Sequence, residues 1–75
     1  MGSNEICEAL FVSFMSCETK PDRTAVAEAV RWAVREYHGI GGCAAEMAAA
    51  YGEDPESAVA RMRWARSVVA SLTSA

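Results

Sequence analysis

Alanine constrains this chain more than any other residue, because fifteen of its 75 residues are alanine and only two are leucine. Alanine is the strongest helix former, but it contributes little apolar area when it is buried. A chain of this length also buries a modest share of its surface, which leaves a thin margin of stability. We therefore predict one all-α domain, stabilised by close helix packing or by burial of further apolar surface against a second chain.

Proline and glycine divide the chain into four segments with helical periodicity. Ser3 or Asn4 is expected to cap the first helix and Asp22 or Thr24 the second, while Asp54 caps the last. The segments predict a small four-helix domain over residues 4–73, with a C-terminal helical hairpin and a disordered N-terminus at residues 1–3. The predicted helices span residues 4–17, 22–38, 43–51 and 54–72.

The first segment allows two interpretations. Ile6, Leu10 and Phe14 fall on one side of a helix, whereas Leu10, Val12 and Phe14 alternate as in a strand. We favour the helix, because valine is the one β-branched residue of the alternating set and no second strand is available to pair with it. The periodicity of all four segments predicts a core of Ile6, Leu10, Phe14, Val26, Val30, Val34, Tyr37, Met47, Tyr51, Met62, Val69 and Leu72.

The charge balance argues against a general polyanion-binding protein. Ten acidic and seven basic residues give a net charge of −3, whereas domains that bind nucleic acid usually carry a basic excess. Nucleic-acid binding is therefore disfavoured, although a local basic patch would be compatible with it. The apolar run over residues 6–15 has acidic neighbours and is too short to cross a bilayer, so we expect neither a signal peptide nor membrane association.

The cysteines give no sign of a disulfide framework or a metal site. Cys7, Cys17 and Cys43 are odd in number and form no C-x-x-C motif, and reduced thiols fit a cytoplasmic protein. His38 and Cys43, on either side of a glycine-rich turn, are the one conceivable catalytic pair, in which the histidine would deprotonate the thiol. No third residue is placed to orient that pair, so we expect no enzyme activity and no cofactor.

Two tryptophans point away from the apolar stripes of their own helices. Each lies about 120° from the centre of its stripe, and Trp32 stands beside Arg35. Tryptophan and arginine are enriched at binding hot spots, so these positions predict a second contact surface. The competing interpretation is that other helices of one compact bundle cover both indoles. The predicted partner-binding residues are Phe11, Met15, Trp32, Arg35 and Trp64.

These features favour a small cytoplasmic protein-interaction module or regulatory adaptor, which binds another protein or itself as a homodimer. The alternative is a helix-turn-helix-like DNA-binding regulator, in which the helix from Asp54 to Leu72 enters the major groove with Arg61, Arg63 and Arg66. Acidic residues at the approaching end of that helix would repel phosphate, and the three arginines point in different directions. We therefore rank the DNA-binding hypothesis second.

The C-terminal third of the chain carries a resemblance to known proteins. The runs GCAAE (residues 42–46), YGEDPES (51–57) and RMRWAR (61–66) resemble a group of small Ala/Arg-rich helical proteins from high-GC actinobacteria. The resemblance implies a bacterial, cytoplasmic setting and carries no catalytic residue over to this chain. Six arginines against one lysine agree with a GC-rich coding sequence.

Overall fold

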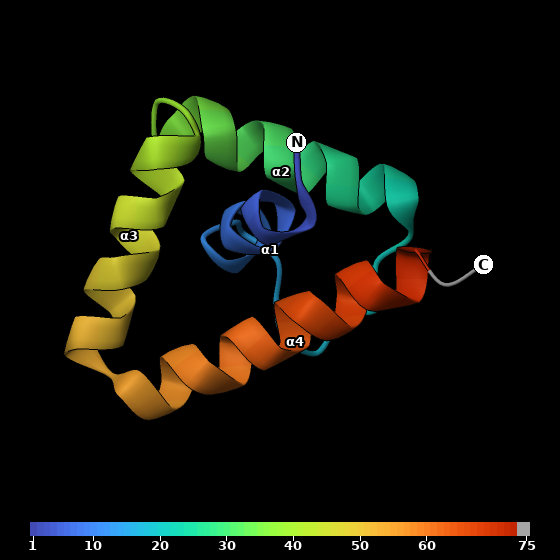
Figure 1. Ribbon diagram of the computed structural model, residues 1–75. Coiled ribbons are helices and arrows are strands. Elements are labelled where there is room, and N and C mark those ends of the chain that lie inside the picture. The colour runs from blue at the N-terminus through green and yellow to red at the C-terminus, as the bar shows by residue number, and fades with distance from the viewer. Residues whose placement is uncertain (74–75) are drawn as a thin grey trace.

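Three helices surround a short central one. The computed structural model describes residues 1–73, which form α1 (Ser3–Phe11), α2 (Arg23–Glu36), α3 (Ile40–Glu53) and α4 (Pro55–Thr73) and contain no strand. Viewed nearly along α1, the other three helices follow one another around it (Figure 1). Helix α1 contacts all three, whereas α2 and α4 make at most marginal contact because α1 lies between them. The predicted all-α, four-helix fold class is confirmed.

The starts of the helices follow local capping rules. Asp22 is the N-cap of α2, and its Oδ1 accepts a hydrogen bond from the backbone N–H of Ala25 at 2.9 Å. Asp54 Oδ1 likewise accepts from the backbone N–H of Ser57 at 3.3 Å, just before Pro55 begins α4. These contacts satisfy amide donors that have no partner within the helix. Asp54 was predicted as a cap, and Asp22 was one of the two residues predicted for α2. The prediction of Ser3 or Asn4 as the cap of the first helix is wrong, because α1 begins at Ser3 with Gly2 as its N-cap.

Helix α1 ends six residues earlier than its apolar periodicity predicts, and a tertiary contact explains the difference. In a longer helix the carbonyl of Phe11 would accept from Met15, and that of Ser13 from Cys17. Both carbonyls instead accept hydrogen bonds from the guanidinium of Arg61 on α4. The backbone N–H of Met15 donates instead to the hydroxyl oxygen of Ser13 at 3.3 Å. The predicted helix 4–17 is therefore wrong after Phe11.

The turn between α2 and α3 depends on glycine. His38 and Gly39 adopt φ angles of 62° and 111°, in the left-handed region that glycine tolerates best. The turn returns the Gly39 N–H to the carbonyl of Val34 at 2.7 Å, as at many helix C-termini. A Cβ at Gly42 would overlap the carbonyl group of Tyr37, so α3 approaches the end of α2 more closely than any side chain allows. Helix α3 starts at Ile40, three residues before its predicted start.

The core is built largely from alanine. Ala9, Ala29, Ala33 and Ala65 have no exposed surface, which lets neighbouring backbones approach closely. The largest fully buried side chains are those of Leu10 and Cys43. Five of the twelve predicted core residues are buried, six are half-buried, and Phe14 is 60 % exposed; Phe14 is a wrong core prediction, since α1 ends before it. The radius of gyration of 11.3 Å matches the value of about 11 Å expected for a compact chain of this length.

The C-terminal pair of helices, predicted as a helical hairpin, consists of two consecutive helices in contact, but it is open rather than folded back on itself. Asp54 is the single residue between α3 and α4, and antiparallel helices lying side by side need a longer connection, of about two to five residues. The two helices therefore diverge from a corner (Figure 1). That corner leaves room for α1, which packs against both of them.

Candidate protein-interaction surface

Arg61 fastens the end of α1 to α4. Its Nε donates to the carbonyl of Phe11, and its Nη2 donates to the carbonyl of Ser13 at 3.0 Å. Its Nη1 also contacts Cys17 Sγ at 3.2 Å, and the guanidinium carbon lies 5.0 Å from the ring centroid of Trp64. Arginine suits this position because its planar fork can serve several acceptors at once.

Trp64 also connects α4 to the segment that follows α1. Its indole Nε1 donates to the carbonyl of Thr19 at 3.0 Å, which holds the loop before α2 against α4. Trp64 is half-buried, and both its polar edge and one ring face are used within the chain. Of the predicted partner-binding residues, Trp64 and the buried Phe11, which stacks on Tyr51 with ring centroids 5.9 Å apart, thus make internal contacts.

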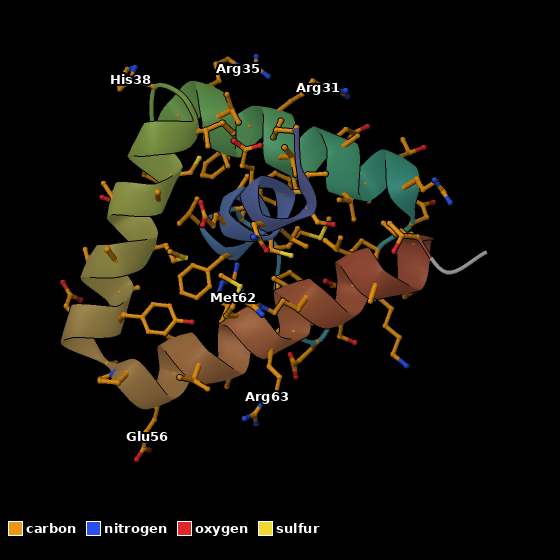
Figure 2. All side chains as sticks on the ribbon, viewed as in Figure 1. Arg31, Arg35, His38, Glu56, Met62 and Arg63 are labelled. Atoms are coloured by element: carbon orange, nitrogen blue, oxygen red, sulfur yellow. The ribbon has the colours of Figure 1, made fainter. Side chains whose placement is uncertain are left out.

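The three arginines of the DNA-binding hypothesis do not form one surface. Arg61 is half-buried and bound to α1, while Arg63 and Arg66 are exposed. Figure 2 shows Arg63 pointing away from the molecule, whereas Met62 beside it points to the interior. Because Arg61 is engaged by backbone carbonyls, it does not contribute a free guanidinium for a phosphate or a base edge.

An aromatic patch, which we define as Phe14, Trp32 and Tyr37, lies on the side of α2 away from the start of α1. The rings of Phe14 and Trp32 meet edge to face with centroids 5.4 Å apart and an interplanar angle of 84°. Trp32 and Tyr37 meet in the same manner at 6.2 Å. Trp32 and Tyr37 are half-buried, and Phe14 projects into solvent. Aromatic residues held in this way offer large, rigid contact area.

Opposite charges flank the patch on α2. Glu28 and Arg35 are both exposed and, seven residues apart, share one side of the helix. Trp32 lies between them, about one turn from each. Figure 2 shows Arg31 and Arg35 extending outward from α2, away from α1. Met15, another predicted partner-binding residue, is half-buried, and its Sδ accepts from the hydroxyl of Thr19 at 3.6 Å.

The residues of the conceivable catalytic pair face different surroundings. His38 is exposed in the turn, whereas Cys43 has no exposed surface. Burial raises the pKa of the Cys43 thiol, and Glu8 raises it further; burial also raises the pKa of Cys7, against an opposing effect of Arg66. These shifts favour the protonated thiol, which is a weak nucleophile. Cys17 is the exposed cysteine.

Within residues 1–73, no three histidine, cysteine, aspartate or glutamate side chains gather closely enough to hold a metal ion. None of the four helices has the length and apolar character needed to cross a membrane. Comparison with protein-family models, with curated proteins and with solved structures gives no match for this chain. The surface therefore has to be interpreted from its own chemistry.

The sequence predicts Trp32 and Arg35 as partner-binding residues, which stays a prediction, and it does not include the other two members of the patch. Phe14 and Tyr37 were assigned to the core, because both continue the apolar periodicity of the helix before them. The serines on either side of Phe14 were the available signal, since serine favours turns over helix interiors. Nothing local to Phe14 shows that an arginine almost fifty residues later ends the helix.

Proposed function

We propose that the protein is a small cytoplasmic interaction module, or regulatory adaptor, that self-associates through the aromatic patch and the outer face of α2. The observation that carries this proposal is the 60 % exposure of Phe14 while its ring packs edge to face against Trp32. Leaving so large an apolar ring in water costs free energy that a contact with another chain would recover.

The face is complementary to itself, which favours a second copy as the occupant. In a two-fold dimer the same residues from both copies meet. An antiparallel pair of α2 helices, with the symmetry axis beside Trp32, would bring Glu28 of each copy next to Arg35 of the other. The aromatic rings would then pack at the centre, and the ion pairs would lie at the rim, as in typical interfaces.

The expected association is weak. A standard interface covers about 800 Å² on each partner, which is roughly a sixth of the 4732 Å² accessible surface of this chain. Helix α2 has 14 residues and is therefore about 21 Å long and about 10 Å wide, so one of its faces covers less than that area. We therefore expect a dimer with a dissociation constant in about the micromolar range or above.

Charge reversal tests this arrangement. Arg35→Glu places like charges opposite each other and should abolish the concentration-dependent rise in mass seen by sedimentation equilibrium. Glu28→Arg should do the same, and the double variant Glu28→Arg/Arg35→Glu should restore it, because the pairs are re-formed with opposite signs. Arg63→Glu, on the far side of α4, is the matched control and should dimerise like the unmodified chain.

The ring contribution is tested separately by Phe14→Ser, which removes an exposed side chain and leaves the helices intact. Val59→Ser is its control, since Val59 is 43 % exposed on α4. A strictly monomeric unmodified protein, or a double charge variant that stays as monomeric as its two parents, would contradict the proposed interface.

A further inference from the structure

A second apolar surface lies on the other side of α2. We define the apolar groove by Ile6 from α1, Val26, Ala27 and Val30 from α2, and Val69 and Leu72 from α4. It forms because α2 and α4 are held apart by α1 instead of packing on each other. Its volume is about 390 Å³, which is within the range of sites that hold apolar groups.

Arginines stand along one wall of this groove. Arg23 and Arg31 both line it from α2, eight residues apart, which corresponds to about 12 Å along the helix. The guanidinium of Arg23 also donates to the carbonyl of Leu72 at the end of α4, which fixes its position at one end of the groove. Arg31 is exposed.

We propose that the apolar groove binds an acidic amphipathic helix of another protein. Such a helix inserts apolar side chains spaced three and four residues apart into a groove between helices. Two acidic residues about two turns apart on its edge would match the spacing of Arg23 and Arg31. This proposal names a second surface and a second partner, and it does not depend on the self-association proposed above.

The chain itself offers no suitable occupant among its described residues. Its large exposed apolar side chains are Met1, Phe14 and Val59; Met1 already lines the groove, and the three form no row on one helix. The exposed face of α3 is acidic at Glu46 and Glu53 but otherwise consists of alanine and glycine, too small to fill the groove. These features favour a different protein over a second copy.

The shape of the groove also favours a helix over an anionic membrane. A single helix can lie along the groove, insert its apolar side chains and contact the two arginines at the wall. The net charge of −3 on the chain would also oppose binding to acidic lipids.

The experiment uses the whole chain and a fluorescent helical peptide with leucines three and four residues apart and two flanking glutamates about eight residues apart. Anisotropy should show saturable binding that weakens as salt is raised. A matched peptide with lysine in place of both glutamates should bind about tenfold more weakly or worse. Absence of binding by the glutamate peptide, or equal binding by both peptides, overturns the proposal.

Variants of the protein test whether the peptide binds in the apolar groove. Arg31→Glu should weaken peptide binding about tenfold or more, while Arg63→Glu, which is outside the groove, should leave it unchanged. Ala27→Asp puts a carboxylate on the groove wall and should also weaken binding, with Ala60→Asp as the exposed control on α4; circular dichroism confirms that each variant folds. Equal effects of paired variants overturn the proposal, as does saturable binding to anionic vesicles in place of the peptide. Loss of self-association in Ala27→Asp alone would likewise overturn it, because a second copy would then occupy the groove.

Discussion

Replacing Arg61 with alanine should destabilise the protein more than any other single change on the surface of α4. The substitution leaves two carbonyl acceptors, those of Phe11 and Ser13, without their guanidinium donor. It also removes the contact with the face of Trp64 at 5.0 Å. Hydrogen bonds to charged groups contribute about 1.5–3 kcal/mol when fully formed. Because Arg61 is half-exposed, we assign about 1 kcal/mol to each and about 0.5 kcal/mol to the cation–π contact.

The sum of about 2.5 kcal/mol corresponds to a fall in Tm of roughly 10–20 °C for a domain of this size. Thermal and urea unfolding followed by circular dichroism measure it, and tryptophan fluorescence, to which Trp32 and Trp64 both contribute, should change in parallel. Arg63→Ala is the matched control, with an expected effect of less than about 0.5 kcal/mol. Arg61→Lys should lose most of the stabilisation that the guanidinium of Arg61 provides, because an ammonium group cannot donate to both carbonyls. If Arg61→Ala unfolds within about 0.5 kcal/mol of Arg63→Ala, the role assigned to the guanidinium is refuted.

Three further outcomes are expected. Gly42→Ala should lower the free energy of unfolding by about 2 kcal/mol or more, because the added Cβ overlaps the carbonyl of Tyr37. Gly41→Ala should stabilise α3 by up to about 1 kcal/mol, because its Cβ meets nothing within 4 Å. Equal unfolding midpoints for the two variants would contradict this packing. Thiol labelling of the native protein should modify Cys17 quickly and Cys7 and Cys43 slowly, and three equal rates would argue against the buried positions. Burial raises the pKa of both buried thiols, Cys7 and Cys43, above the ordinary value of 9.0. The protonated thiols therefore make their full contribution to the free energy of unfolding below pH 9.0. This contribution declines as the pH rises further, because the unfolded chain loses these protons first. In a Cys43→Ala variant the free energy of unfolding should fall less steeply with pH, and an unchanged slope would contradict the raised pKa of Cys43.

Local signals predicted the starts of α2 and α4, but not the N-cap of α1 or the start of α3. Asp22 and Asp54 carry capping side chains next to the residues they serve, so their role can be read within four positions of the chain. The alanine content predicted close helix packing for a comparable reason, since helix propensity and small size are properties of the residue itself. Residues such as Ala33 and Ala65 then became buried simply because they share a helix face with larger apolar residues.

Long-range contacts account for what the sequence did not reveal. The apolar period of α1 continues through Phe14 to Cys17 and predicts helix, but Arg61 binds the carbonyls on which the next turn would depend. The same contact turns Phe14 outward, which creates the exposed part of the aromatic patch, and it engages the guanidinium of Arg61 within the chain. An interaction across almost fifty residues leaves no local pattern in the sequence. The wrong end of the first helix and the wrong core assignment of Phe14 therefore have one physical cause.

The most direct test of the proposed self-association is a dilution series of ¹H–¹⁵N spectra that resolves the two indole N–H signals. The indole of Trp64 is bound to the carbonyl of Thr19 within the chain, whereas Trp32 belongs to the proposed interface. The Trp32 signal should shift with protein concentration while that of Trp64 stays in place. If both signals are independent of concentration up to about millimolar protein, or if only the Trp64 signal moves, the proposed interface is contradicted.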